Sequence, residues 1–431
     1  MVTKVGSGVY LSSLLVAGIN VIVGLFTSVL VARMLGPLER GELADIMFIA
    51  ATTTSILMIL MPPRSLIWRL SRNYSPEVLG GAVMVIFSQT ILVFATVPLI
   101  IYLFHRGATL SVLDVYLLAT ITAVAQVIYN GLCALLRARA KFGLVTVTIL
   151  AVSGGYLIAL LFLLLIKDIK VTTILVANTL PVWGCAFFLW FNLGDPIKIW
   201  SKIEFIHYIK AGWKFLPLAL FELAFNSADR ALILKFANLS ALGFYVVAAS
   251  VTVPLILLAE TIVQISFVEV TRELNASKAG FLALHRFRLL QVVITILGIG
   301  IGIFGPMLVP ILFGSAYMDS IPPLLWLTFA MVLRGQSSIL NNSLQAIGHT
   351  KLSLISSLIG LFFIIFSGYI LIPKYQETGA AESVAIGYIA IFIYQVSLWH
   401  YKYKFSIYEF WGFKKSTFLL ITNSLRRYLY K

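Results

Sequence analysis

LVTVTILAVSGGYLIALLFLLLI, residues Leu144–Ile166, is a run without a single charged side chain. An α-helix rises about 1.5 Å per residue, so about 20 apolar residues are needed to cross a hydrocarbon core of about 30 Å. The run therefore predicts a membrane-spanning helix. A strand of a membrane barrel is shorter and alternates polar with apolar residues, so a barrel is excluded.

Eleven further runs of this kind lie on both sides of it. They are Val9–Val31, Leu43–Pro62, Ala82–Phe104, Val112–Leu136, Thr172–Leu193, Trp213–Leu234, Leu242–Ser266, Leu289–Phe313, Pro322–Ala346, Leu352–Ile372 and Ser383–Tyr401. The composition agrees, because 60% of residues are hydrophobic and 11% are charged, against about 25% charged in soluble domains. The sequence predicts an all-α polytopic membrane protein with about twelve transmembrane helices.

Basic residues are distributed unevenly between the predicted loops. With the N-terminus in the cytoplasm, 23 Lys and Arg residues fall on the cytoplasmic side and seven on the opposite side. The positive-inside rule then predicts that both termini are cytoplasmic. Most of the net charge of +15 is explained by topology, so no nucleic-acid partner is expected.

The chain reads as two similar halves. Arg33 and Gly41 correspond to Lys235 and Gly243 at one constant offset, and six spans return the chain to its starting side. Halves that share an orientation are related by an axis along the membrane normal, as in several transporters. We expect a six-helix bundle over 1–193, a cytoplasmic linker helix on the membrane surface over 194–212, a second bundle over 213–402 and a basic cytoplasmic tail over 403–431.

Ionisable side chains inside the predicted spans need a physical reason, because a charge at the bilayer centre costs at least about 2.5 kcal/mol. Five of them stand out, Glu222, Asp229, Arg230, Glu260 and Arg334, with Arg33 at the end of the first span. Glu222, Asn226 and Asp229 follow each other at spacings of four and three, so they share one helix face. Arg334 begins a second polar stretch that continues through Gln336 to Asn342.

Two interpretations of these residues stay open. In one, they form buried networks or amide contacts that hold helices together. In the other, they line a wet cavity, where guanidinium groups suit a phosphate. The cavity hypothesis assigns substrate binding to Arg33, Arg230, Arg334, Asn226, Gln336 and Asn342, and charge balance or a coupled proton to Asp229, Glu222 and Glu260.

Signs of catalysis or of a cofactor are missing from the sequence. Cys133 and Cys185 fall inside predicted helices without a metal-binding or redox spacing. No Gly-rich phosphate loop, metal-ligand cluster or nucleophile elbow is found. We therefore expect no metal, no cofactor and no catalytic residues, and a transporter in place of an enzyme.

Several short motifs are spread over most of the chain. They are Ala32-Arg33-Met34-Leu35-Gly36-Pro37 with Gly41 and Ala44, Asn226-Ser227-Ala228-Asp229-Arg230 followed by Leu242-Gly243-Phe244-Tyr245, Ile311-Leu312-Phe313-Gly314 with Tyr317, and Asn342 to Gly348 with Lys351. The combination is similar to the multidrug, oligosaccharidyl-lipid and polysaccharide (MOP) exporter superfamily, and most of all to its O-antigen branch. Phe244 and Pro62-Pro63 depart from the pattern.

The resemblance implies a cargo and a location. An O-antigen flippase acts in the bacterial inner membrane on an undecaprenyl-pyrophosphate-linked oligosaccharide, and its partners are the bilayer and other membrane proteins of glycan assembly. A drug or metabolite antiporter of the same fold is one alternative. A membrane-embedded glycan polymerase or ligase is another, although the outer loops are short for such an enzyme.

Overall fold

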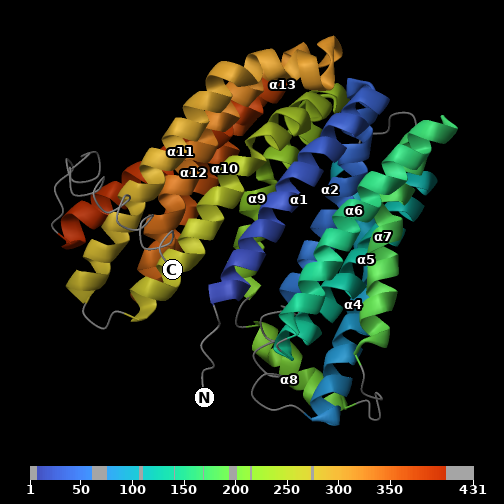
Figure 1. The fold of residues 1–431 in the computed structure, drawn as a ribbon, viewed down its shortest axis with the longest axis horizontal. Coiled ribbons are helices and arrows are strands. Elements are labelled where there is room, and N and C mark those ends of the chain that lie inside the picture. The colour runs from blue at the N-terminus through green and yellow to red at the C-terminus, as the bar shows by residue number, and fades with distance from the viewer. Residues whose placement is uncertain are drawn as a thin grey trace. The chain divides into compact units, whose positions relative to one another are not determined.

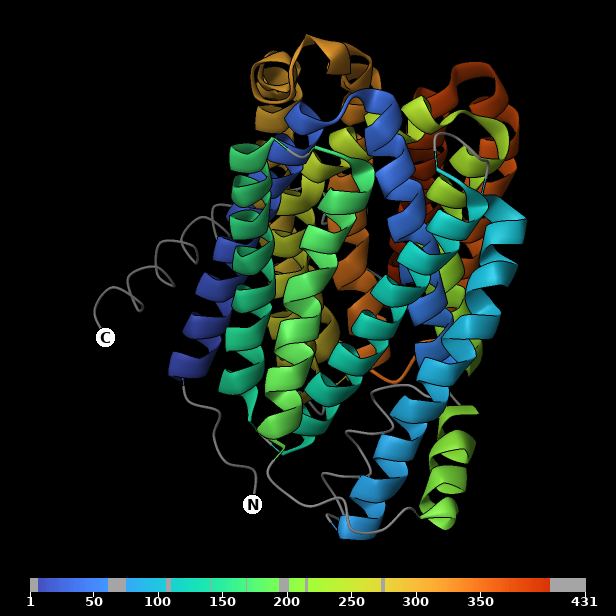
Figure 2. The same cartoon turned by 90° about the vertical axis from the view of Figure 1, so that its right-hand side faces the viewer.

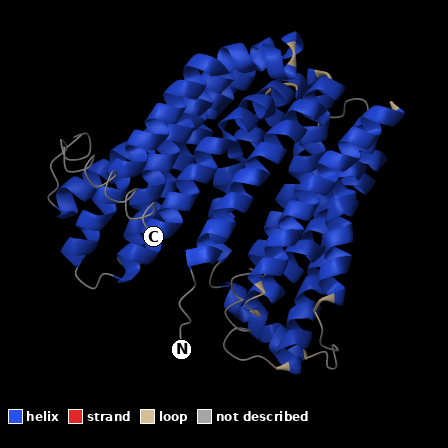
Figure 3. Ribbon diagram, viewed as in Figure 1, coloured by secondary structure: helices blue, strands red, loops and turns tan. Residues whose placement is uncertain are grey.

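The computed structural model describes residues 7–60, 75–105, 110–139, 141–167, 169–193, 201–213, 216–272 and 276–403. Within these ranges Figure 3 shows helices joined by short loops, and no strand. Nine helical stretches of this part of the chain are long and apolar enough to cross a membrane. The predicted fold class, an all-α polytopic membrane protein, is confirmed. The tail beyond residue 403 and the first part of the linker lie outside the described residues.

The chain divides into two compact units, Met1–Val246 and Val247–Lys431. Helices of the first unit, labelled in Figure 1, are α1 (Ser7–Met34), α2 (Pro37–Leu60), α4 (Pro76–Phe104), α5 (Val112–Ala138), α6 (Phe142–Ile166), α7 (Val171–Phe191), α8 (Lys202–Trp213), α9 (Leu216–Phe236) and the first turns of α10 (Leu239–Arg272). Within the described residues, each apolar run predicted over this part of the sequence is helical over most of its length. The unit border falls inside α10, and the division into two six-helix bundles stays a prediction.

The core of the N-terminal unit forms where α2, α4, α5 and α7 pack together. Small and β-branched side chains such as Ala119, Ala123 and Val127 are fully buried on one face of α5. On the same helix, the Thr122 hydroxyl lies 3.0 Å from that of Thr179 on α7. Close approach through small residues and hydroxyl contacts is the usual way in which helices associate inside a membrane.

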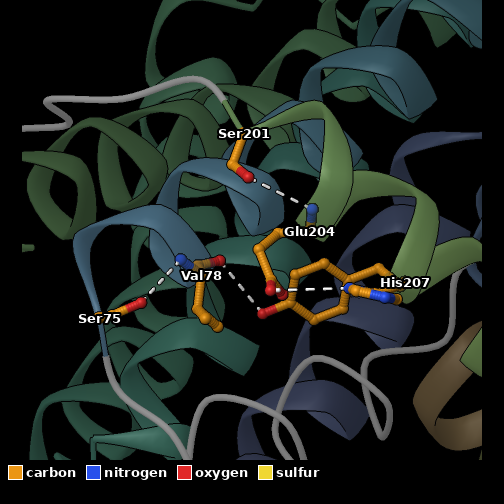
Figure 4. Close-up of polar contacts among 6 residues, drawn as sticks. Ser75, Val78, Ser201, Glu204 and His207 are labelled. Atoms are coloured by element: carbon orange, nitrogen blue, oxygen red, sulfur yellow. Dashed lines mark hydrogen bonds and ion pairs between the residues drawn. The ribbon is translucent and has the colours of Figure 1, made fainter.

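The linker helix α8 docks against the beginning of α4, and Figures 2 and 4 show the two side by side. The fully buried Tyr208 donates its hydroxyl to the Val78 carbonyl oxygen at 3.2 Å. A Cβ on Gly81 would lie 2.6 Å from the Cβ of Glu204, so only glycine allows this approach. The described part of the predicted linker is α8, and one of its faces rests on α4.

The C-terminal unit contains the rest of α10, followed by α11 (Ala276–Phe313), the short 3-10 helix η1 (Ser315–Ser320), α12 (Ile321–Ala346) and α13 (Thr350–Tyr403). Helix α13 breaks at Gln376, where φ is 48° and ψ is −121°. Its two arms are antiparallel, because Gln395 Nε2 donates to Ser356 Oγ at 3.1 Å and a Cβ on Gly379 would meet the Leu371 carbonyl oxygen. The arms correspond to the last two predicted spans.

One predicted loop is wrong. The predicted spans Leu242–Ser266 and Leu289–Phe313 leave the residues between them as a loop, whereas α10 continues to Arg272 and α11 begins at Ala276. The segment carries polar residues, but its Leu284 and Phe287 side chains are buried, and Phe287 stacks on Phe392 of α13 with ring centroids 6.3 Å apart. Burial of this apolar face stabilises the part of α11 that precedes the predicted span.

Candidate functional site

The repeat-related glycines form a symmetric backbone contact within the N-terminal unit. A Cβ on Gly41 of α2 would lie 1.7 Å from the Leu239 carbonyl oxygen, and a Cβ on Gly243 of α10 would lie 2.2 Å from the Pro37 carbonyl oxygen. Pro37 and Leu239 are separated along the chain by the same offset as Gly41 and Gly243. The first turns of α2 and α10 are therefore equivalent partners in one contact.

Beside this contact lie three ionisable side chains that we call the α2 polar cluster: Glu42, Asp45 and His105. Glu42 and Asp45 are fully buried, and the His105 side chain is 3% exposed. Arg40 on the same helix is 8% exposed, and its guanidinium donates to Ser28 Oγ of α1 at 3.4 Å. His105, at the end of α4, places Nδ1 2.7 Å from Asp45 Oδ2. The Glu42 carboxylate accepts a hydrogen bond from the Leu110 backbone N–H at 2.9 Å. Both carboxylates thus link α2 to the segment between α4 and α5.

The sequence analysis missed this cluster. It assigned Arg40 and Glu42 to the loop after the first span and did not single out Asp45, although Asp45 lies inside the predicted second span. Helix α2 begins at Pro37, six residues before the predicted start, which moves Arg40 and Glu42 into a helix. The signal that was available is the spacing of three between Glu42 and Asp45, which places both on one face.

The polar residues of α9 separate into different environments. Asp229 accepts a hydrogen bond from the hydroxyl of the buried Tyr245 on α10 at 2.5 Å, and from the Arg230 backbone N–H at 2.8 Å. The Arg230 and Asn226 side chains are exposed, as is Arg33 in the last turn of α1. Asp229 therefore has a structural hydrogen bond that joins α9 to α10. Glu222 belongs to α9, but its side chain lies outside the described set.

In the C-terminal unit, α12 presents Arg334 and Gln336 on different faces. Gln336 is 5% exposed and its Nε2 donates to Thr295 Oγ1 on α11 at 3.4 Å. Arg334 is half-buried, and Asn342 lies eight residues beyond it, on the same face. The amide of Asn342 donates to the Ser338 carbonyl oxygen at 2.8 Å. Gln336 therefore fits the interhelical interpretation, whereas Arg334 and Asn342 form one polar face.

Two further expectations concern Glu260 and metal binding. Glu260 is exposed on α10, one residue after the buried Ala259 that packs near Gly335. Among the described residues, no group of three or more His, Cys, Asp or Glu side chains is placed to hold a metal ion. The candidate site thus consists of α9 and α1 side chains in one unit and of α10 and α12 side chains in the other.

Comparison with known proteins gives few matches by sequence. No protein-family model matches the chain. An uncharacterised membrane protein of Methanocaldococcus jannaschii is 30% identical over 105 residues, which are 24% of this chain and 21% of that protein. The matched segment thus spans about a fifth of the relative's length.

Comparison by structure is more extensive. The chain is similar to the lipid II flippase MurJ in an inward closed conformation, with a TM-score of 0.76 and 16% identity over 92% of this chain and 88% of that chain. It is also similar to an inward-facing multidrug resistance MATE transporter of the MOP superfamily, with a TM-score of 0.66 and 15% identity over 89% and 94%. Identities this low show the fold alone. The chain shares the fold of these two solved transporters, one of which is described as a member of the MOP superfamily.

Proposed function

We propose that this chain is a flippase that moves an undecaprenyl-pyrophosphate-linked oligosaccharide across the bacterial inner membrane by alternating access. The observation that carries the proposal is the similarity to a lipid II flippase over 92% of the chain, with a TM-score of 0.76. The similarity to the multidrug transporter has a lower TM-score, 0.66. The resemblance of the sequence motifs to O-antigen flippases points to an oligosaccharide in place of lipid II.

In this proposal the anionic pyrophosphate is held by arginine side chains. Arg33 and Arg230 are exposed in the N-terminal unit, and Arg334 is half-buried on the polar face of α12. Guanidinium groups bind phosphate oxygens in a bidentate manner, and a low dielectric strengthens this interaction. Asn226 and Asn342 add polar contacts, while Asp229, Glu222 and Glu260 balance charge or carry a coupled proton.

Gln336 has a supporting role in the proposed site. Its donor reaches Thr295 between α11 and α12, so its hydrogen-bonding capacity is partly used within the unit. Its role in the proposal is to orient α12 behind Arg334 and not to touch the cargo. In this proposal the lipid tail of the cargo stays in the bilayer during alternating access.

A drug or metabolite antiporter is the second candidate. The MATE similarity favours it, because it covers 94% of that transporter at a TM-score of 0.66. A glycan polymerase or ligase has less support, since the two structural neighbours are transporters.

Reconstitution tests the flippase proposal. The full chain in liposomes is given a fluorescent undecaprenyl-pyrophosphate oligosaccharide, and the fraction that reaches the outer leaflet is measured with an impermeant quencher. Arg334→Gln is expected to slow flipping at least about tenfold through loss of a charge-assisted phosphate contact, and Arg334→Lys is expected to recover only part, because lysine lacks the planar fork. Lys374→Gln, an exposed change on α13, is the matched control and is expected to flip normally.

The alternatives have their own outcomes in the same system. Accumulation of cationic drugs without flipping would identify an antiporter, and a change in glycan length with detergent-solubilised protein would identify an enzyme. Normal flipping by Arg334→Gln would remove that arginine from the site.

A further inference from the structure

We propose that one end of the C-terminal unit, formed by the corner between α12 and α13 and by the last turn of α13, binds the headgroups of anionic phospholipids. The residues that carry this basic corner are His349, Lys351 and Lys402. The proposal does not rest on the cargo or on transport.

The corner between α12 and α13 has a fixed backbone. Gly348 adopts a φ of +93°, in the left-handed region that favours glycine. The His349 N–H donates to the Leu344 carbonyl oxygen at 2.8 Å, and the Gly348 N–H to the Gln345 carbonyl oxygen at 3.0 Å. These two bonds make a Schellman motif, which ends α12 and starts α13 immediately. His349 and Lys351 are therefore held at defined positions.

Lys402 joins these residues from the far end of α13. The two arms of that helix are antiparallel, so its last turn returns to its first. Burial lowers the pKa of His349, and the positive charge of nearby Lys402 lowers it further. The Lys351 and Lys402 side chains are exposed. A bound anion would favour the protonated form of His349.

Charge is distributed asymmetrically along the C-terminal unit. Gly335 on α12 lies against Ile294 and Gly305 on α11 lies against Leu324, so α11 and α12 are antiparallel, and the start of α11 reaches the basic corner. Among the described residues, this end carries His285, Arg286, Arg288, His349, Lys351, His400 and Lys402. The opposite end carries Asp319, Glu377, Glu382 and Lys374. The anionic surface of a leaflet complements the first end and not the second.

An apolar stripe continues from the basic corner along the first arm of α13. After Lys351, the exposed residues Ile355, Leu358, Phe362, Phe366 and Tyr369 recur at spacings of three and four, with exposed fractions from 43% to 62%. Such a stripe on a spanning helix faces acyl chains. A phosphate beside Lys351 with apolar surface directly below it fits a phospholipid better than a soluble anion.

Lipid retention measures the proposed binding. The full chain is purified in a neutral detergent at low salt, mixed with phosphatidylglycerol or phosphatidylcholine, and analysed by native mass spectrometry. The wild type is expected to retain phosphatidylglycerol more strongly. One lysine near an anionic surface contributes about fivefold in affinity, so Lys351→Gln and Lys402→Gln each weaken phosphatidylglycerol binding by about that factor, and more when combined.

Lys374→Gln is the matched control, because Lys374 is an exposed lysine at the opposite end of the same helix. It is expected to leave phosphatidylglycerol retention unchanged. Melting temperatures of the three variants show that each is folded. Equal retention of both lipids by the wild type, an equal loss in Lys374→Gln, or displacement of the lipid by millimolar inorganic phosphate would each overturn the proposal. Flipping activity is read separately, so the two proposals fail independently.

Discussion

Asp45 and His105 are a pair of ionisable side chains that the fold removes from solvent almost completely. They are 0% and 3% exposed and 2.7 Å apart. Removal of one partner of a buried pair leaves the other charge or donor unsatisfied and costs about 3–5 kcal/mol, whereas removal of both is milder. We expect Asp45→Asn and His105→Gln each to lower the melting temperature in detergent, and the double variant to lose less than the sum.

Glu39→Gln is the control for this prediction, because Glu39 is exposed on the same helix and its change is expected to be neutral. Additive effects of Asp45→Asn and His105→Gln would contradict the pairing, since independent sites add.

Helices α2 and α10 contact each other through glycines, and replacing these glycines tests the contact. No side chain fits between Gly41 and Leu239 or between Gly243 and Pro37 without a backbone shift. We expect Gly41→Ala and Gly243→Ala each to destabilise the protein by at least about 1–3 kcal/mol, the usual cost of overpacking. Similar losses are expected in both, because the two positions are equivalent in the repeat.

Gly154→Ala is the matched control. Nothing lies within 4 Å of a Cβ at this position of α6, so alanine is expected to be neutral or to stabilise the helix by about 0.5–1 kcal/mol. The melting temperatures of the three variants are compared in one detergent. A melting temperature for Gly243→Ala equal to that of Gly154→Ala would contradict the close contact.

The topology of the whole molecule is tested by labelling from one side of the membrane. The native Cys133 and Cys185 are buried, so the background is expected to be low. On intact cells, an impermeant maleimide is expected to label Lys374→Cys and to label Lys351→Cys only after lysis, because the positive-inside rule places Lys351 in the cytoplasm. Labelling of both positions on intact cells would contradict the predicted orientation and the cytoplasmic termini.

The spans and the repeat could be predicted from the sequence, because a span depends on one continuous run of residues and a repeat on a constant offset along the chain. A run such as Leu144–Ile166 is too apolar to face water, so it lies in the membrane. Its backbone hydrogen bonds must be satisfied within the segment in lipid, and a helix satisfies them. The offset that relates Gly41 to Gly243 predicted a repeat, and these two positions meet in the structure. The polarity of α9 and α12 was likewise visible in their composition.

What the tertiary structure decided is which polar groups face one another. Sequence spacing shows that Glu42 and Asp45 share a face, but only the packing of α4 against α2 brings His105 to Asp45. Gln336 and Arg334 are two residues apart, yet the contact with α11 uses Gln336 and leaves Arg334 on another face. The physical reason is that transfer into lipid depends on the residues of one segment, whereas a hydrogen bond over a few ångströms depends on where separate segments meet.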